Sequence, residues 1–212
     1  MTFIKICGIT NLEDALVAID AGADALGFNF YRPSPRYIEP LSARQIIDQL
    51  PGTVLCVGVF VNEDTPETVK SISAESGVNA LQLHGDESPE YCADLSGWYV
   101  IKALSVSEGF DEHKPLDYKV DAIMLDGSHK KLRGGTGQVI DWTVARRVNE
   151  LGVSLFLAGG LSPENVCEAI ATVNPYAVDA CSAIERSPGK KDPNRVRTFV
   201  RAVRASEGQN PK

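Results

Sequence analysis

The chain repeats one unit, an apolar strand followed by an amphipathic helix, along almost its whole length. Several helical stretches end in a glycine that leads directly into the next apolar run, as at Gly22, Gly77 and Gly152. Glycine favours the left-handed conformation that ends a helix. Four helix starts place a capping side chain before a proline: Thr65-Pro66, Ser88-Pro89, Ser162-Pro163 and Asp192-Pro193.

Eight apolar runs have the length of a strand, and most are continuous, as in strands covered on both faces. They are Phe3–Cys7, Ala25–Phe30, Val54–Val61, Ala80–His84, Tyr99–Leu104, Ala122–Asp126, Ser154–Ala158 and Ala177–Cys181. The helices expected between them are Asn11–Ala21, Ser42–Leu50, Pro66–Ser76, Pro89–Leu95, Ser107–Tyr118, Trp142–Leu151, Pro163–Val173 and Pro193–Ala205. The fifth is interrupted by Gly109 and Pro115.

Eight such units predict an α/β fold, a single-domain (β/α)8 TIM barrel over residues 1–205 with a polar, frayed tail over 206–212. A doubly wound sheet is the main alternative fold. That fold often carries a GxGxxG turn after its first strand, and the turn here is Cys7-Gly8-Ile9-Thr10.

Composition excludes several classes of partner. The net charge of −7 argues against nucleic acid, and no apolar run approaches the ~20 residues of a membrane helix. Five cysteines without a CxxC pair argue against a disulfide framework or a zinc site, and the few histidines argue against other metal sites. We therefore expect a cytoplasmic protein with no metal, no membrane and no obligate protein partner.

In a barrel the carboxyl ends of the strands meet at one site. Cys7 ends the first strand beside a helix start, where a thiol can be activated, although buried cysteine is more often inert packing. Asp126 ends the sixth strand and could be a general acid, a partner of Lys102 or a cap on the turn at Gly127. His84 ends the fourth strand and could contact substrate or be structural.

Small residues follow strands seven and eight, at the place where many barrels bind phosphate through backbone N–H groups. They are Gly159 and Gly160 after the seventh strand, and Ser182 and Ala183 after the eighth. The alternative for Gly159-Gly160 is a plain tight turn. We expect a phosphate site.

Positive charge gathers on the same side of this acidic chain, which favours an anionic ligand. Arg36 lies in a loop stiffened by Pro33 and Pro35, and it suits a carboxylate or a phosphate unless it is simply exposed. Lys130-Lys131-Leu132-Arg133 and Lys190-Lys191 add further charge. The stretch Gly134-Gly135-Thr136-Gly137 is typical of a mobile lid.

Taken in order, these segments resemble the phosphoribosylanthranilate isomerases of tryptophan biosynthesis over nearly the whole chain. The matching motifs are Lys5-Ile6-Cys7-Gly8-Ile9-Thr10, Gly27-Phe28, Ser34-Pro35-Arg36-Tyr37, Val57-Gly58-Val59-Phe60-Val61-Asn62, Gln82-Leu83-His84-Gly85, Leu125-Asp126, Gly134-Gly135-Thr136-Gly137, Ala158-Gly159-Gly160-Leu161-Ser162-Pro163-Glu164-Asn165-Val166 and Pro188-Gly189-Lys190-Lys191-Asp192. The resemblance implies a barrel that needs no cofactor or metal.

It also implies the Amadori rearrangement of N-(5-phosphoribosyl)anthranilate to 1-(2-carboxyphenylamino)-1-deoxyribulose 5-phosphate. By the same resemblance Cys7 is the general base and Asp126 the general acid. Arg36 would hold the anthranilate carboxylate, and Gly159, Gly160, Ser182 and Ala183 the phosphate. His84 would contact substrate, and Asp179 would face the sugar or order the loop.

One segment departs from the family pattern. After strand eight the family often has Ser-Ser-Gly-Val-Glu, where this chain has Cys181-Ser182-Ala183-Ile184-Glu185. A positive φ at Ala183 would be costly.

Two other functions fit the strand ends: another phosphosugar isomerase or lyase of barrel fold, and a catalytically silent barrel that binds a phosphate ligand.

Overall fold

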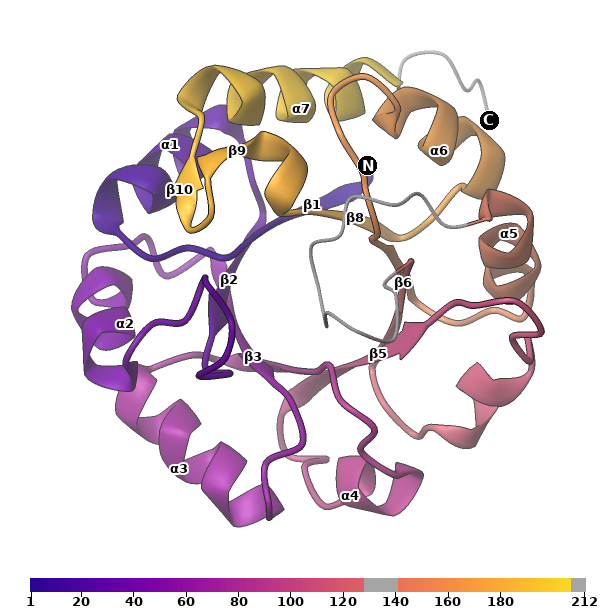
Figure 1. Cartoon of the computed structure of the whole chain (residues 1–212), viewed down its shortest axis with the longest axis horizontal. Coiled ribbons are helices and arrows are strands. Elements are labelled where there is room, and N and C mark those ends of the chain that lie inside the picture. Colours follow the sequence, from indigo (N-terminus) through magenta and orange to yellow (C-terminus); the bar gives the residue numbers. More distant parts are fainter. Residues whose placement is uncertain (128–140, 207–212) are drawn as a thin grey trace.

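Eight parallel strands close into a barrel in the order in which they occur along the chain (Figure 1). The structure is a computed structural model that describes residues 1–127 and 141–206. The strands are β1 (Phe3–Cys7), β2 (Ala25–Asn29), β3 (Leu55–Phe60), β4 (Ala80–Leu83), β5 (Tyr99–Ser105), β6 (Ala122–Asp126), β7 (Leu155–Leu157) and β8 (Ala177–Ala180). The predicted barrel is confirmed.

Helices surround the barrel on its outside (Figure 1). They are α1 (Leu12–Ala21), α2 (Pro40–Ile47), α3 (Pro66–Ser76), α4 (Pro89–Ala93), α5 (Trp142–Glu150), α6 (Val166–Val173) and α7 (Pro193–Ser206). Side chains of Thr65 and Ser88 cap helix starts as the sequence predicts, and Asn11 caps α1. Gly22 and Gly77 end helices in the left-handed conformation.

Several predicted helices are wrong in part. Helix α2 spans Pro40–Ile47 rather than Ser42–Leu50, and α4 ends at Ala93 rather than Leu95. Two other differences have a local cause. The stretch Ser107–Tyr118 forms only the short 3₁₀ helix η1 (Lys114–Asp117), because Gly109 takes a φ of 77° and Pro115 lacks an N–H. Helix α6 begins at Val166 rather than Pro163. Before it, Asn165 Oδ1 accepts from Ser162 N and its Nδ2 donates to Gly160 O, so the residues before α6 form a turn.

A hairpin that the sequence did not predict follows β8. It begins with the 3₁₀ helix η2 (Ser182–Ile184) and continues through β9 (Glu185–Ser187) and β10 (Lys190–Lys191), which pair antiparallel. Thr10 Oγ1 donates to Gly189 O at 2.5 Å, and Lys191 N donates to Asp14 Oδ2 at 2.9 Å. These bonds hold the hairpin against the start of α1 (Figure 1).

The core has two layers. Side chains such as Val57, Ile101 and Phe156 fill the barrel interior, while a larger cluster packs between the strands and the helices. The barrel closes where β1 pairs with β8, in a register that places Lys5 opposite Asp179. No helix in the described part of the chain is long and apolar enough to cross a membrane.

The last helix lies beside the first strand. Arg204 near the end of α7 donates to Thr2 O at 2.7 Å and Gly22 O at 3.1 Å, and it pairs with Asp24 at 2.9 Å. Helix α7 ends at Ser206, so residues 207–212 of the predicted frayed tail lie outside the described residues.

Candidate active site

A cleft lies at the carboxyl ends of the strands, where the sequence predicts the site. Five predicted residues line it together: Cys7, Arg36, His84, Asp126 and Asp179. The other lining residues are Asn29, Tyr31, Ser34, Val59, Val61, Gln82 and Cys181. Gly159, Gly160, Ser182 and Ala183 are outside this lining, in the loops after the adjacent strands β7 and β8.

Cys7 is nearly buried at the end of β1, where its thiol is influenced by a second thiol and by two lysines. A hydrogen bond from the Cys181 thiol, together with the nearby charges of Lys5 and Lys191, lowers the pKa of Cys7 well below the usual thiol value despite burial. The same contact and burial raise the pKa of Cys181. Cys7 is therefore the thiol of this pair that ionises first.

Lys5 lies fully buried one pleat below Cys7 and forms an ion pair with Asp179, with Nζ 2.7 Å from Oδ1. Burial alone would lower the pKa of Lys5, but Asp179 and Cys7 outweigh it and raise that pKa. Burial raises the pKa of Asp179 to about 6, against the opposing charge of Lys5. At neutral pH both groups are charged, so an ammonium lies beneath the thiol.

Arg36 is not the exposed loop arginine of the alternative interpretation. Its side chain is only 11% exposed and forms a two-pronged contact with Glu185, through Nε at 2.9 Å and Nη2 at 2.7 Å. Fully buried Lys191 also pairs with Glu185, at 2.9 Å. Burial favours the neutral form of Glu185, but Arg36 and Lys191 lower its pKa. Glu185 thus holds the guanidinium in place at the cleft.

Asp126 contacts His84 rather than Lys102. Nε2 of His84 lies 3.2 Å from Oδ2 of Asp126. On the other side of the imidazole, Nδ1 lies 2.7 Å from Nε2 of Gln82. Gln82, His84 and Asp126 therefore form a chain of contacts along the wall of the cleft, from β4 to β6.

Lys102 has a different partner from the one the sequence suggested. It is fully buried, and its Nζ lies 2.7 Å from Glu87 Oε2. It also donates to the carbonyl oxygens of Leu83 at 3.3 Å and Gly85 at 2.8 Å. The pairing with Asp126 is thus wrong, and Lys102 instead fixes the backbone on both sides of His84.

The two loops in which a phosphate site is predicted, after β7 and after β8, differ in backbone conformation. Gly159 and Gly160 take φ values of 81° and 68°, a region that disfavours a side chain. Within residues 1–127 and 141–206, no acceptor is seen for the N–H of either glycine. Ala183 belongs to η2, and the described non-glycine residues with positive φ are Asn62 and Asn174, so the expected strain at Ala183 does not arise.

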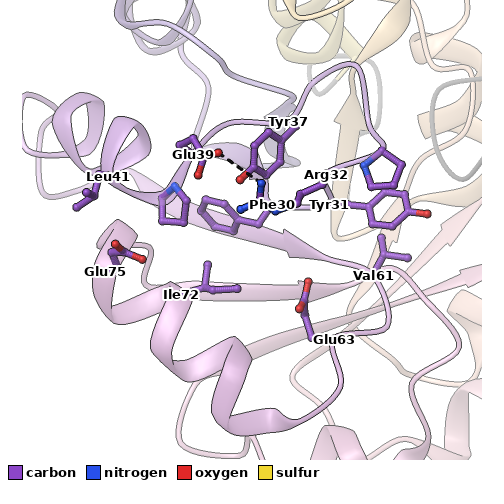
Figure 2. Close-up of a pocket in the computed structure, with 12 residues that line it drawn as sticks. Phe30, Tyr31, Arg32, Tyr37, Glu39, Leu41, Val61, Glu63, Ile72 and Glu75 are labelled. Carbon is purple, nitrogen blue, oxygen red and sulfur yellow. Dashed lines mark ion pairs between the residues drawn. The ribbon is translucent and has the colours of Figure 1, made fainter.

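A larger cavity lies beside the cleft, against α2 and α3 (Figure 2). Its lining combines apolar side chains such as Phe30 and Ile72 with the carboxylates of Glu39, Glu63 and Glu75. It shares Tyr31 and Val61 with the cleft but holds none of the predicted site residues. Reactive groups gather in the smaller cleft.

Three residues of the site were missed by the sequence analysis: Gln82, Glu185 and Lys191 in its role as a buried ion-pair partner. Gln82 carries a detectable signal, since it is a polar side chain in an apolar run and shares a strand face with His84. The contact of Glu185 with Arg36 has none, because the two residues lie 149 positions apart.

Two expectations fall on residues that the structure does not describe. The predicted lid at Gly134–Gly137 and the basic cluster at Lys130–Arg133 both lie within residues 128–140. Among the residues that are described, no group of three or more His, Cys, Asp or Glu side chains is placed to hold a metal ion.

Comparison with known proteins gives one consistent match. A family model described as N-(5'-phosphoribosyl)anthranilate (PRA) isomerase matches residues 4–202. The N-(5'-phosphoribosyl)anthranilate isomerase of Trichlorobacter lovleyi is 47% identical over 201 residues, which cover 95% of this chain and 97% of the relative.

Solved structures agree with that match. The phosphoribosyl anthranilate isomerase of Thermotoga maritima has a TM-score of 0.90 and 43% identity, covering 97% of this chain and 100% of that one. A structure of a phosphoribosyl anthranilate isomerase in complex with reduced 1-(o-carboxyphenylamino)-1-deoxyribulose 5-phosphate has a TM-score of 0.87 and 42% identity, covering 97% of this chain and 100% of that one.

Proposed function

The chain belongs to the N-(5'-phosphoribosyl)anthranilate isomerase family and catalyses the isomerase reaction of tryptophan biosynthesis, and from this premise we propose that Cys7 and Asp126 carry its two proton transfers. The substrate is N-(5-phosphoribosyl)anthranilate, an aminoaldose. The product is the aminoketose 1-(2-carboxyphenylamino)-1-deoxyribulose 5-phosphate. Ring opening requires an acid and the following rearrangement requires a base.

Asp126 protonates the ring oxygen of the furanose, and the C1–O bond breaks to give an open-chain iminium ion. The positive charge at that ion acidifies the hydrogen on C2. The thiolate of Cys7 then removes this proton and leaves an enolamine with a hydroxyl on C2. The ketone forms when C1 gains a proton and that hydroxyl loses one. The lowered pKa of Cys7 supports this role, because the base must be deprotonated before the reaction begins.

The two anionic ends of the substrate have separate partners in the proposal. Arg36, oriented by Glu185, holds the anthranilate carboxylate. The N–H groups around Gly159-Gly160 and Ser182-Ala183 hold the phosphate. Asp179 faces the sugar, and His84 contacts the substrate from the wall that carries Asp126. The bound product analogue in a related isomerase is consistent with a ligand of this class.

The observation that carries the proposal is that Cys7 and Asp126, from β1 and β6, line one cleft. A silent phosphate-binding barrel would not need this pair. Neither would another phosphosugar enzyme of the same fold, such as a relative of indole-glycerol-phosphate synthase.

The substrate's anthranilate fluorescence provides the test, because it is lost on turnover. We expect Cys7→Ser and Asp126→Asn each to lower kcat by at least about 100-fold, the usual contribution of a positioned acid or base. Binding of a product analogue should persist in both. Cys167→Ala, at an exposed cysteine on α6, is the matched control and should turn over normally. Near-normal rates in both site variants would remove the proposed mechanism.

We also propose that the protein works in the cytoplasm. All five cysteines are free thiols, and Cys7 must stay reduced to act as a base. A reducing compartment meets that requirement.

A further inference from the structure

We propose that Gln82 is a positioning residue of the isomerase reaction, which fixes His84 as the Nε2–H tautomer and so aims that N–H at Oδ2 of Asp126. The inference rests on the proposed function only in taking Asp126 as the acid. It adds a residue that acts through two others, His84 and Asp126.

The orientation of the imidazole follows from what a glutamine amide can do. Nε2 of Gln82 is a donor and lies 2.7 Å from Nδ1 of His84, so Nδ1 must accept. A neutral imidazole that accepts at one nitrogen carries its proton on the other. The proton of His84 is therefore on Nε2, the atom 3.2 Å from Asp126.

The backbone around His84 is held independently of its ring. Lys102 donates to the carbonyl oxygens of Leu83 and Gly85, the residues on either side. The backbone therefore has little freedom to move the ring, and the side-chain torsions are what Gln82 has to fix. A side chain that must point at one atom needs both its backbone and its side-chain torsions held.

Stability alone does not explain a polar side chain at position 82. Gln82 is only 1% exposed, and its Oε1 is buried without a partner in the described part of the protein. A buried amide with an unsatisfied oxygen costs folding free energy compared with an apolar residue of the same shape. Such a group in a cleft calls for a functional explanation.

The proposed effect on the acid is specific. When Oδ2 of Asp126 faces the Nε2–H of His84, the other oxygen, Oδ1, is the one that presents a proton to the ring oxygen of the substrate. After the proton has left, the same N–H stabilises the carboxylate. The interaction is thus stronger after proton transfer than before it, which is what lowers a barrier.

The experiment reads the tautomer directly, by long-range ¹H–¹⁵N correlation NMR of the ¹⁵N-labelled full chain. The chain has three histidines, and His84→Asn identifies the His84 signals by their loss. We expect the Nε2–H pattern for His84 at neutral pH. A wild-type Nδ1–H pattern, or an imidazolium, would overturn the proposal.

Two variants connect the tautomer to turnover. Gln82→Glu keeps the shape but offers only acceptors, so His84 should carry a proton on Nδ1 as well as on Nε2, which faces Asp126, and give the imidazolium pattern. Gln82→Met removes the polar contact and should give a mixture of tautomers. For each we expect kcat to fall by about tenfold, the effect of about one positioning hydrogen bond, with KM changed by less than about twofold.

Gln45→Glu is the matched control, because Gln45 is exposed on α2; neither the His84 signals nor kcat should change. A changed tautomer with unchanged kcat, or a loss confined to KM, would overturn the positioning role. Failure of the proposed function is a separate result: an active Asp126→Asn would remove the acid while leaving the tautomer of His84 as measured.

Discussion

At the scale of single residues, a second thiol, that of Cys181, helps to lower the pKa of Cys7. The hydrogen bond from Cys181 is the largest cause of the lowered pKa of Cys7. The sequence shows Cys181 near the site, but it cannot show which of two neighbouring thiols donates to the other.

We expect Cys181→Ala to raise the pKa of Cys7, because the thiolate loses its hydrogen-bond donor. The base is active when deprotonated, so the acid limb of the kcat/KM profile should move to higher pH. Iodoacetamide should also react more slowly with Cys7 at neutral pH, since less thiolate is present.

Cys181→Ser keeps a donor in the same place and should shift the acid limb less than Cys181→Ala. Cys56→Ala, at a buried cysteine on β3, should leave the limb where it is. An acid limb that is the same in Cys181→Ala and in the wild type would show that this hydrogen bond does not set the reactivity of Cys7.

Sequence reasoning predicts which residues meet at the cleft better than it predicts what they contact. Cys7, His84, Asp126 and Asp179 follow from one rule, that the ends of barrel strands converge. The partners of Arg36 and Lys102 do not follow, because they lie in loops and in a hairpin whose path the apolar pattern does not encode. The roles of the nine predicted residues stay predictions until the variants are measured.

At the scale of elements, the barrel depends on the pairing of its first and last strands. Lys5 on β1 and Asp179 on β8 are opposite each other in the register and form a buried ion pair. Breaking such a pair from one side leaves a buried charge without a partner.

Lys5→Met and Asp179→Asn should each lower the free energy of unfolding by about 3–5 kcal/mol, the usual cost of stranding a buried charge. The double variant should lose less than the sum of the two single losses, because it strands no charge. Urea unfolding of the four proteins at pH 7 measures this. Strictly additive losses would mean that the two side chains do not interact.

The apolar pattern predicts the strands well and the helices unevenly. All eight strands are found near their predicted positions, because a strand covered on both faces is a continuous apolar run. Ser107–Tyr118 is a helix in the prediction but forms only the short 3₁₀ helix η1 in the structure, since Gly109 and Pro115 break the backbone pattern there. The hairpin of β9 and β10 is too short to give a periodic signal.

At the scale of the whole molecule, the end of the last helix is joined to the start of the first strand. Arg204 bonds two backbone carbonyls and the carboxylate of Asp24, which in turn accepts from the N–H of Ile4. One side chain thus connects α7, β1 and the start of β2.

Arg204→Ala should lower the free energy of unfolding by about 1–3 kcal/mol, the range for hydrogen bonds that involve a charged group. Urea unfolding measures the loss, and kcat at 25 °C should not change. Arg146→Ala is the matched control, because its pairing with Glu150 is exposed, and it should cost less than about 0.5 kcal/mol. Equal effects of the two substitutions would contradict the role given to Arg204.

The contact between Arg204 and Thr2 also fixes which side of the barrel carries the ends of the described chain. Strand β1 begins, and helix α7 ends, at the amino-terminal rim, while the reactive cleft opens at the opposite rim. If the enzyme is attached to a solid support, or fused to another protein, through either of these ends, its active-site cleft faces away from the support or the fusion partner. Attachment through these ends therefore leaves the cleft open to substrate in an immobilised enzyme.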